Sequence, residues 1–463
     1  MDLINKNYGN IKLLEQLSKR IGIHQIIEAC FPNCFKEILA LSFYEIMEGS
    51  PFYLFRFWLD ENYLPEVKKL DSSASSTLFE ELGKKEKQRL LCVEKWIKHL
   101  HLNALFFDIS SISSYSKQID FIEWGYNRDK EALAQLNIGM VFCEEKRLPI
   151  NYHLYPGSIA DVSTLKNCQD YLKAFGLKDF MFVLDRGFFS IANVLAMNES
   201  TNSISFIQPV PFRLNKAKQL VQKHKKEVQK LGASFRYKQQ IINHIQSEIT
   251  FGKTTFKAHL FYNKKMDLSL RHQLLNTLFD IEQQLTDIVF HTLKQWIDYR
   301  KEYIEEKYRA FFKWNSKTNK VEKNSKTIQA HINFSAYFIF LTNKADLTPQ
   351  SLSHHYFNKD LVEKVFDVLK NELDAKRLRF HNNYTMQGKL FIMFIALVVY
   401  SEISRVMNDK NLFKKFTVKE LLYELKKIKI NQLPKDGQPM ISEISKTQKM
   451  ILKNFNINLF HGY

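Results

Sequence analysis

Several features that would assign this 463-residue chain to a specialised class are missing from it. It has five cysteines, an odd number, and no CxxC pair, which argues against a disulfide framework and against a zinc ribbon. Cys30 and Cys34 lie near His24, but in an apolar stretch where a free cysteine usually behaves as a small hydrophobic residue. We therefore expect a reduced, cytoplasmic protein without structural zinc.

Long apolar segments are also lacking. The longest apolar run, residues 390–400, is about half of the roughly 20 residues that a membrane-spanning helix needs, so it predicts a buried core helix. Residues 1–6 contain no apolar signal core, and export is therefore not expected. No internal repeat is visible, which argues against a solenoid or a propeller.

The chain has an excess of basic residues. Lysine and arginine number 67 against 49 acids, a formal charge of +18, which favours a polyanionic partner through phosphate neutralisation and counterion release. Nucleic acid is the first candidate and an anionic membrane surface the second, while a lysine-rich proteome would explain the charge without either. With 45% hydrophobic residues the chain can form one large core and smaller satellites.

The hydrophobic pattern predicts five segments. Residues 1–103 have helical periodicity broken at Pro32, Pro51 and Pro65, and the serine-rich patch after Asp71 predicts a helix cap. This segment is expected to be a helical N-terminal domain that binds DNA ends. The remaining predicted segments are a catalytic domain in two parts (104–206 and 336–405), an insertion domain (207–335) and a basic helical C-terminal segment (406–463).

Within the catalytic domain the pattern predicts strand, hairpin, helix, strand. The expected elements are a strand at 103–108, hairpin strands at 137–143 and 149–155, a helix at 163–174, a strand at 179–185 and a last strand at 336–341. The insertion is expected to contain a lysine-rich helix (215–231), a strand pair around Gly252 and a long charged helix (269–312). We therefore predict an α/β fold with a ribonuclease-H-like mixed sheet interrupted by an insertion domain.

Two aspartates follow apolar runs of this predicted sheet. Asp108 and Asp185 should each emerge at a strand end, where acids on neighbouring strands can share a divalent ion. Oxygen-only ligands suit Mg²⁺ or Mn²⁺, and two such ions can activate an attacking oxygen and stabilise a leaving one. The alternative is that each aspartate only accepts hydrogen bonds from loop amides.

A third acid has distinctive neighbours. Tyr356, Lys359 and Lys370 lie at offsets of −7, −4 and +7 from Glu363, within roughly 60° on one face of a helix predicted at residues 360–373. Such a face can hold a metal ion and grip phosphates, while an apolar stripe beside it, including Val362 and Phe366, would dock the helix on the sheet. An ordinary charged solvent face, with Lys359 and Glu363 as a helical ion pair, is the alternative.

These residues resemble a known signature. The order tyrosine, two residues, arginine, three residues, glutamate, six residues, lysine is the YREK signature of DDE insertion-sequence transposases, and this sequence is similar to it at every gap. Lys359 replaces the arginine, which keeps the charge but loses bidentate geometry. The segments 106–111, 125–130, 157–161 and 183–188 and the pair Leu148-Pro149 resemble the same family in the right order.

The resemblance implies a bacterial transposase that cuts and joins DNA. It implies Asp108, Asp185 and Glu363 as catalytic residues and ligands of two Mg²⁺ or Mn²⁺ ions. Tyr356, Lys359 and Lys370, and more weakly Arg186, would contact DNA. Asp161 is expected only to cap the helix near Ser163.

The expected partners are double-stranded DNA, as transposon ends and as target, and a second copy of the chain in a synaptic complex. No membrane partner is expected, and the protein should be cytoplasmic and associated with the nucleoid through DNA. In the insertion, a tryptophan could stack on a flipped base or simply pack in the core, and basic residues could follow the phosphate backbone or lie on a solvated face. The residues concerned are Trp296, Trp314, Lys223 and Lys226.

Two other functions share these features. One is a catalytically silent DNA-binding protein derived from a transposase. The other is a nuclease of the same fold that hydrolyses DNA without joining it.

Overall fold

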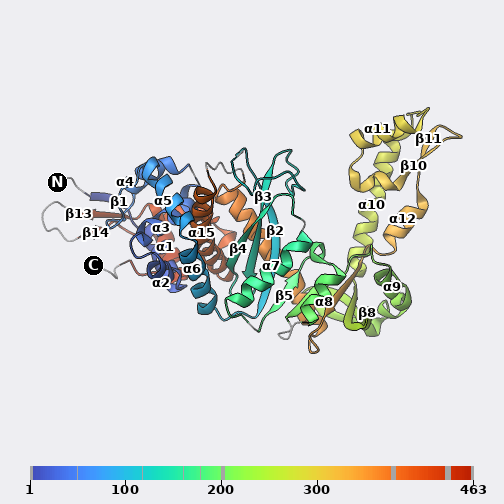
Figure 1. Ribbon diagram of the computed structural model, residues 1–463, viewed down its shortest axis with the longest axis horizontal. Helices are drawn as coiled ribbons and strands as arrows, with labels where there is room; N and C mark the ends of the chain where they lie inside the picture. The colour runs from blue at the N-terminus through green and yellow to red at the C-terminus, as the bar shows by residue number, and fades with distance from the viewer. Residues whose placement is uncertain are drawn as a thin grey trace. The chain divides into compact units, whose positions relative to one another are not determined.

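The structure is a computed structural model that describes residues 4–49, 51–116, 118–159, 161–177, 179–199, 204–376, 382–432 and 439–459. It is a mixed α/β protein with many helices (Figure 1). The chain forms two compact units. Unit 1 comprises Met1–Phe188, Thr201–Ile204 and His355–Tyr463, and unit 2 comprises Phe189–Ser200 and Ser205–His354. The five segment boundaries predicted above stay predictions.

The first part of unit 1 is helical, and its breaks fall where proline was expected to place them. Pro32 lies between α2 and α3, Pro51 precedes η1, and Pro65 lies between α4 and α5. The predicted cap is confirmed, because the Asp71 carboxylate accepts a hydrogen bond of 2.8 Å from the backbone N–H of Ala74 at the start of α5. The elements are α1 (Gly9–Arg20), α2 (Ile23–Cys30), α3 (Phe35–Glu48), η1 (Phe52–Leu54), α4 (Phe55–Glu61), α5 (Ser72–Lys84) and α6 (Glu86–His99).

The two ends of the chain meet in unit 1, which the sequence did not predict. Strand β1 (Ile4–Asn7) pairs with β13 (Lys429–Gln432), which pairs in turn with β14 (Met440–Ile441). The Tyr8 N–H donates to the Ile428 carbonyl over 2.9 Å. The C-terminal part therefore contains strands as well as its expected helices, which are η6 (Leu412–Lys414), α16 (Val418–Lys426) and α17 (Lys446–Phe455).

The core helix of unit 1 is α15 (Asn383–Asp409), which packs against α3, α5 and β4 (Figure 1). It is the one helix in the described part of the chain that is long and apolar enough to cross a membrane, but 89% of its most apolar window is buried within the protein. Two glycines permit close contact with α5, because a Cβ on Gly388 would lie 1.9 Å from the Phe79 carbonyl and one on Gly83 1.9 Å from the Tyr384 carbonyl.

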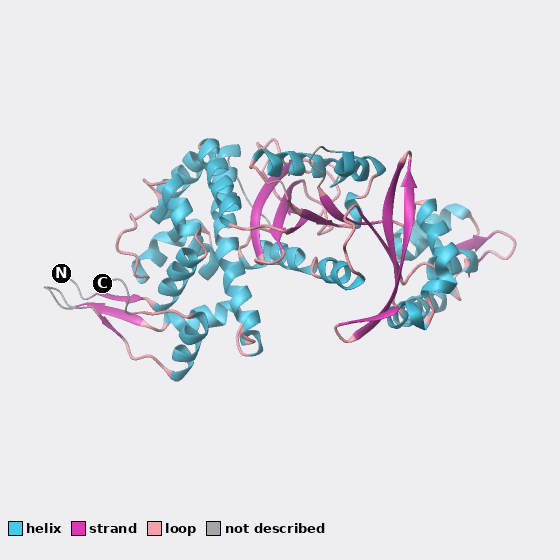
Figure 2. Ribbon diagram, turned by 90° about the horizontal axis from the view of Figure 1, so that it is seen from below, coloured by secondary structure: helices cyan, strands magenta, loops and turns pink. Residues whose placement is uncertain are grey.

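Four strands of unit 1 lie in the order β4-β3-β2-β5. They are β2 (Ala104–Ser113), β3 (Gln135–Cys143), β4 (Leu148–Pro156) and β5 (Met181–Leu184), and Figure 2 shows the strands of the protein among its helices. The predicted hairpin is confirmed by the antiparallel β3–β4 pair, and β5 runs parallel to β2. The remaining elements between β4 and unit 2 are α7 (Asp161–Ala174) and η2 (Arg186–Phe188).

Two expectations about the elements that carry Asp108 and Glu363 were wrong. Strand β2 does not end at Asp108 but continues to Ser113, because its second half pairs antiparallel with β3 as far as Gln135. The single helix expected at 360–373 is α14 (Asp360–Asp367) followed by the π-helical turn η5 (Val368–Glu372), and the preceding helix α13 (Pro349–Phe357) ends before Lys359. The predicted apolar stripe, including Val362 and Phe366, is buried.

Unit 2 contains an antiparallel group of strands in the order β6-β12-β9-β8-β7. The strand pair expected around Gly252 is confirmed, and Gly252 supplies the positive φ of +59° in the β8–β9 turn. The elements are α8 (Ile191–Glu199), β6 (Ser205–Pro209), α9 (Asn215–Val228), η3 (Leu231–Ala233), β7 (Ser234–Tyr237), β8 (Gln240–Phe251), β9 (Thr254–Tyr262) and β12 (Tyr337–Thr342).

The prediction of one long charged helix at 269–312 was wrong. This region belongs to a second core of unit 2. Helix α10 (Lys264–Leu285) ends and α11 (Leu293–Tyr303) begins anew, because Thr292 and Gln295 form a capping box. This core is built around Trp296, Phe290 and Leu278. Its further elements are η4 (Glu306–Phe311), β10 (Phe312–Asn315), β11 (Lys320–Lys323) and α12 (Ser325–Ile332).

Candidate active site

Strand register places the two aspartates beside each other in unit 1. The parallel β2–β5 pair ends with Phe107 opposite Leu184, so the next residues are Asp108, still in β2, and Asp185, immediately after β5. Neighbours in register on parallel strands direct their side chains to the same face of a sheet. Asp108 lies in the middle of β2 rather than at its end. It is level with the end of β5, where the chain at Asp185 leaves the sheet.

Lys359 joins the second and third acids. Its Nζ lies 2.8 Å from Asp185 Oδ1 and 3.2 Å from Glu363 Oε1. Glu363 is in the first turn of α14, which contacts β2, the strand of Asp108. The Lys359 side chain is 13% exposed and that of Glu363 is 57% exposed. Lys359 thus pairs with Asp185 and Glu363, and its positive charge also acts on the carboxyl group of Asp108.

The two aspartates have opposite pKa shifts. Burial raises the pKa of Asp108 to about 6, although the positive charges of Lys359 and Arg128 act in the other direction. Burial also opposes ionisation of Asp185, but its contacts with Lys359 and the backbone amides of Arg186 and Gly187 outweigh that effect and lower its pKa. Asp185 is therefore well stabilised as a carboxylate, whereas Asp108 is a partly buried acid whose charge is under-compensated.

Tyr356 lies at the same site but on a different helix from Glu363. It is near the end of α13, half-buried, and burial raises the pKa of its hydroxyl, with Lys359, Asp185 and Arg186 as its charged neighbours. Arg186 is exposed in η2, immediately after Asp185. Tyr356, Lys359, Glu363 and Arg186 therefore lie at one site, although they do not share one helical face.

The turn between α13 and α14 is attached to the β3–β4 hairpin by a residue that the sequence did not single out. Glu144 is 6% exposed, and its carboxylate lies 2.5 Å from His355 Nδ1 and accepts a 2.7 Å hydrogen bond from the Asn358 side chain. His355 and Asn358 lie on either side of Tyr356 in the sequence, and Asn358 directly precedes Lys359. The only available signal was the acidic hairpin turn, because its partners lie more than 200 residues away.

Lys370 is turned away from the acids. It is 9% exposed, and its Nζ lies 2.7 Å from Asp129 Oδ2. A π-helical turn fits more residues into each turn than an α-helix, so the angle expected between Glu363 and Lys370 does not hold. Lys370 is thus bound within the protein rather than presented to solvent.

The candidate residues of unit 2 differ in exposure. Trp296 is 1% exposed in the second core, and Trp314 is partly buried with its indole N–H donating to the Phe290 carbonyl over 2.8 Å. Both rings have the core environment that was the alternative to base stacking. Lys223 and Lys226 are exposed on α9. Asp161 is the first residue of α7, but its side chain lies outside the described residues.

The three acids fit a divalent cation in their chemistry. Each offers only oxygen ligands, which Mg²⁺ and Mn²⁺ prefer, and the raised pKa of Asp108 indicates a carboxyl group that a nearby cation would stabilise as its anion. In the structure, however, Asp185 and Glu363 pair with Lys359. Within the described ranges, no group of three or more histidine, cysteine, aspartate or glutamate side chains has a metal-binding arrangement.

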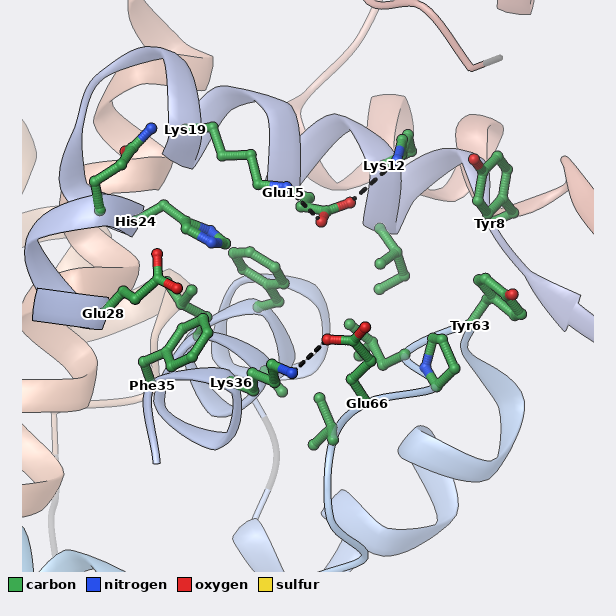
Figure 3. Close-up of a pocket in the computed structure, with 18 residues that line it drawn as sticks. Tyr8, Lys12, Glu15, Lys19, His24, Glu28, Phe35, Lys36, Tyr63 and Glu66 are labelled. Carbon is green, nitrogen blue, oxygen red and sulfur yellow. Dashed lines mark hydrogen bonds and ion pairs between the residues drawn. The ribbon is translucent and has the colours of Figure 1, made fainter. Parts of the chain in front are cut away.

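A second collection of charged side chains lines a cavity of about 890 Å³ among the N-terminal helices (Figure 3). There Glu15 pairs with Lys12 and Lys19, at 3.4 and 2.9 Å, and Glu66 pairs with Lys36. Each of these acids thus has a cation of its own, and the ion pairs lie on the pocket wall. Glu28 is a third acid on this wall.

Comparison with known proteins assigns the family. A family model described as "Transposase DDE domain" matches residues 101–399, and no curated protein matches the chain. The chain is similar to a solved structure described as a piggyBac transposase synaptic complex with hairpin DNA. The identity is 12%, the TM-score is 0.39, and the match covers 85% of this chain and 70% of that one. A TM-score this low leaves the fold to be judged from the chain's own topology. The match of the family model over most of the chain shows that the protein belongs to the transposase DDE domain family.

Proposed function

We propose that this protein is the transposase of a bacterial insertion sequence, which binds terminal inverted repeats and catalyses Mg²⁺-dependent cleavage and strand transfer of DNA. The observation that carries the proposal is that strand register brings Asp185 beside Asp108, while Lys359 pairs with both Asp185 and Glu363, which lies on a helix in contact with β2. Acids that are far apart in the sequence have little reason to share one cation unless the site is built to hold positive charge.

We also propose that the protein belongs to the YREK group and has a ribonuclease-H-like core. The spacing from Tyr356 to Lys370 supports the YREK group. Three antiparallel strands followed by a helix and a strand parallel to the first support a ribonuclease-H-like core, with the acids on the two central parallel strands and an outer helix. We also propose that residues 207–335, which separate the two parts of this core in the sequence, are an insertion domain.

Each acid has a distinct task in the proposal. Asp108, Asp185 and Glu363 would hold two Mg²⁺ or Mn²⁺ ions, which when bound would supply charge stabilisation to the attacking and leaving oxygens of a phosphodiester. Asp185 is held ready as an anion by backbone amides. Glu363 is the more exposed of the two side chains that Lys359 joins and can adjust its position to the ligand it binds.

Lys359 has two roles in this proposal. Before DNA and metal bind, it compensates the repulsion between the acids. With its ammonium released, it can contact a DNA phosphate as a point charge, because an ammonium lacks the planar fork of arginine. Tyr356 and Arg186 lie beside it and complete a polar surface for the same strand. The exposed lysines of α9, Lys223 and Lys226, would contact phosphates further away.

The proposed partners are transposon ends and target DNA, bound by a homodimer in the synaptic complex. We propose a cytoplasmic location associated with the nucleoid. The full chain, incubated with the ends of its element and Mg²⁺, should release 3′-hydroxyl ends and join them to a target plasmid. Release without joining would favour a nuclease of the same fold, and metal-independent binding without release would favour a silent DNA-binding descendant.

A further inference from the structure

Helix α10 of unit 2 has two apolar faces, one buried and one exposed. Leu274 and Leu278 belong to the second core of the unit and mark the buried face. On the other face, Leu268 is 63% exposed, Phe279 is 56% exposed and Leu275 is 39% exposed. Figure 1 shows α10 as the long helix that leads from the strands of unit 2 to this second core.

The exposed apolar residues lie on one line along the helix. From Leu268 the line passes through His272, Leu275, Phe279 and Glu282, in steps of four, three, four and three residues. At 100° per residue these five positions lie within about 80° of one another, and the buried leucines are centred roughly 100° away. Alternating steps of four and three residues are the spacing at which the side chains of two helices interlock. The line therefore has the spacing of a helix–helix interface.

The charges of α10 are placed against its own helix dipole. Lys264 and Lys265 are exposed at the N-terminal end, which carries partial positive charge. Asp280 and Glu282 lie in the last two turns, toward the negative end, and the last turn has no basic residue to offset them. Asp267, the one acid of the first turn, is buried and paired within the helix. This placement is unfavourable for α10 as a single helix.

We propose that two copies of this chain associate through α10, with the two helices antiparallel and related by a twofold axis near the middle of the exposed line. Leu268 of each copy then packs on Phe279 of the other, and His272 packs on Leu275.

Charge complementarity selects both the partner and its orientation. In the antiparallel pair, Lys264 and Lys265 of one helix lie near Asp280 and Glu282 of the other, at both ends of the interface. The two helix dipoles also oppose each other, so each pair of lysines lies beside the negative end of the second helix. A parallel pair would instead place lysine beside lysine and acid beside acid.

The contacts that α10 already makes leave this face accessible. Lys323 Nζ lies 2.6 Å from the Glu282 carboxylate and 3.9 Å from the centre of the Phe279 ring. The Glu282 side chain nevertheless stays 43% exposed and Phe279 56% exposed. One pair of 22-residue helices, each about 33 Å long, forms a small interface, so we expect a reversible dimer with a Kd on the order of 10 μM.

This inference goes beyond the proposed function and is tested without DNA. Sedimentation equilibrium of the full chain in EDTA measures the dimerisation constant when neither DNA nor a metal ion can bridge two copies. Thermal unfolding of each variant shows whether the monomer is still folded.

Exchange of charge is the most specific test. Lys264→Glu/Lys265→Glu and Asp280→Lys/Glu282→Lys should each weaken dimerisation at least about tenfold, because each variant places like charges together at both ends of the pair. The variant with all four substitutions should dimerise like the wild type, since its charges are exchanged but still complementary. If that variant is less stable, an equimolar mixture of the two double variants supplies the same test and should form a mixed dimer.

The apolar line is tested by Leu275→Ser, which should weaken dimerisation about tenfold without changing the thermal unfolding of the monomer, because Leu275 is exposed. Leu231→Ser is the matched control. It changes a leucine that is 89% exposed on η3, elsewhere in unit 2, and should leave dimerisation unchanged.

A wild type that stays monomeric at about 100 μM, where a dimer of this Kd is mostly formed, would overturn the inference. So would a dimer that both double variants and Leu275→Ser leave intact, since another surface would then form it. A chain that dimerises through α10 but does not cleave DNA keeps this inference and removes the proposed function. A chain that cleaves DNA without dimerising through α10 does the reverse.

Discussion

Unit 1 contains two groups of charged side chains that differ in how charge is compensated. At the N-terminal cavity, Glu15 has two lysines and Glu66 has one. At the acidic site, Asp185 and Glu363 share one lysine, and burial raises the pKa of the nearby Asp108. The first arrangement stabilises the fold it belongs to. The second leaves negative charge uncompensated, which is unfavourable for the isolated protein and useful for binding cations.

The largest expected effect concerns activity. Asp108→Asn, Asp185→Asn and Glu363→Gln should each lower DNA cleavage at least about 1,000-fold, because loss of a ligand removes several kcal/mol of charge stabilisation. Cleavage of an end-labelled substrate in Mg²⁺ measures this. Glu15→Gln is the matched control and should cleave at the wild-type rate. A catalytic role for Glu363 would be refuted if its glutamine variant retained most of its activity.

The next effect concerns Lys359. Lys359→Met should lower the free energy of unfolding in EDTA by about 3 kcal/mol, because it leaves partly buried carboxylates without their shared cation. Mg²⁺ should restore much of that loss by binding the folded state. Urea unfolding with and without Mg²⁺ measures both effects. Lys36→Met, at a more exposed pair, should lose less than about 1 kcal/mol and gain nothing from Mg²⁺.

The pH dependence should separate the two groups by sign. The pKa of Asp108 is raised from 3.8 to about 6 in the folded state, so its contribution to stability is present below about pH 4 and is lost as the pH rises through 6. That loss is on the order of 3 kcal/mol, and Asp108→Asn should abolish it in EDTA. Contacts with Lys19 and Lys12 outweigh burial and lower the pKa of Glu15, so its contribution is lost as the pH falls.

Urea unfolding at a series of pH values tests this contrast. Between pH 6 and 8 in EDTA, Asp108→Asn should be more stable than the wild type, although it is inactive. If the variant is less stable than the wild type in that range, burial does not leave the Asp108 carboxylate under-compensated.

The smallest effect is expected within the cavity. Glu15→Gln should change the free energy of unfolding by less than about 1 kcal/mol at pH 7, since the Glu15 side chain is 31% exposed and its ion pairs are screened. Mg²⁺ should not alter the result. A Mg²⁺-dependent change in this variant would remove the distinction between the two groups.

Local sequence patterns were sufficient to predict much of the acidic site. The β3–β4 hairpin, strand β5 and the apolar stripe of α14 followed from hydrophobic periodicity, and of the signature residues Tyr356 and Glu363, but not Lys370, lie near Lys359. Asp108 was expected at a strand end because its apolar run stops there. Pairing with β3 prolongs the strand to Ser113, and that pairing depends on residues from Gln135 onward.

Other features depend on contacts that a local pattern does not contain. The β1–β13 pair joins residues from opposite ends of the chain, and Lys370 is turned toward Asp129 by a π-helical turn. The break between α10 and α11 has a local signal in the Thr292 capping box, but the charged periodicity on both sides concealed it. The burial of Trp296 depends on the whole second core of unit 2.

The central claim is that the three acids bind divalent cations together, and Mn²⁺ binding to the full chain tests it most directly. Electron paramagnetic resonance measures free Mn²⁺ for the wild type, for Asp108→Asn, Asp185→Asn and Glu363→Gln, and for Glu15→Gln. We expect each of the first three substitutions to weaken Mn²⁺ binding at least tenfold and the control to leave it unchanged. Wild-type affinity in any of the three would contradict a shared site.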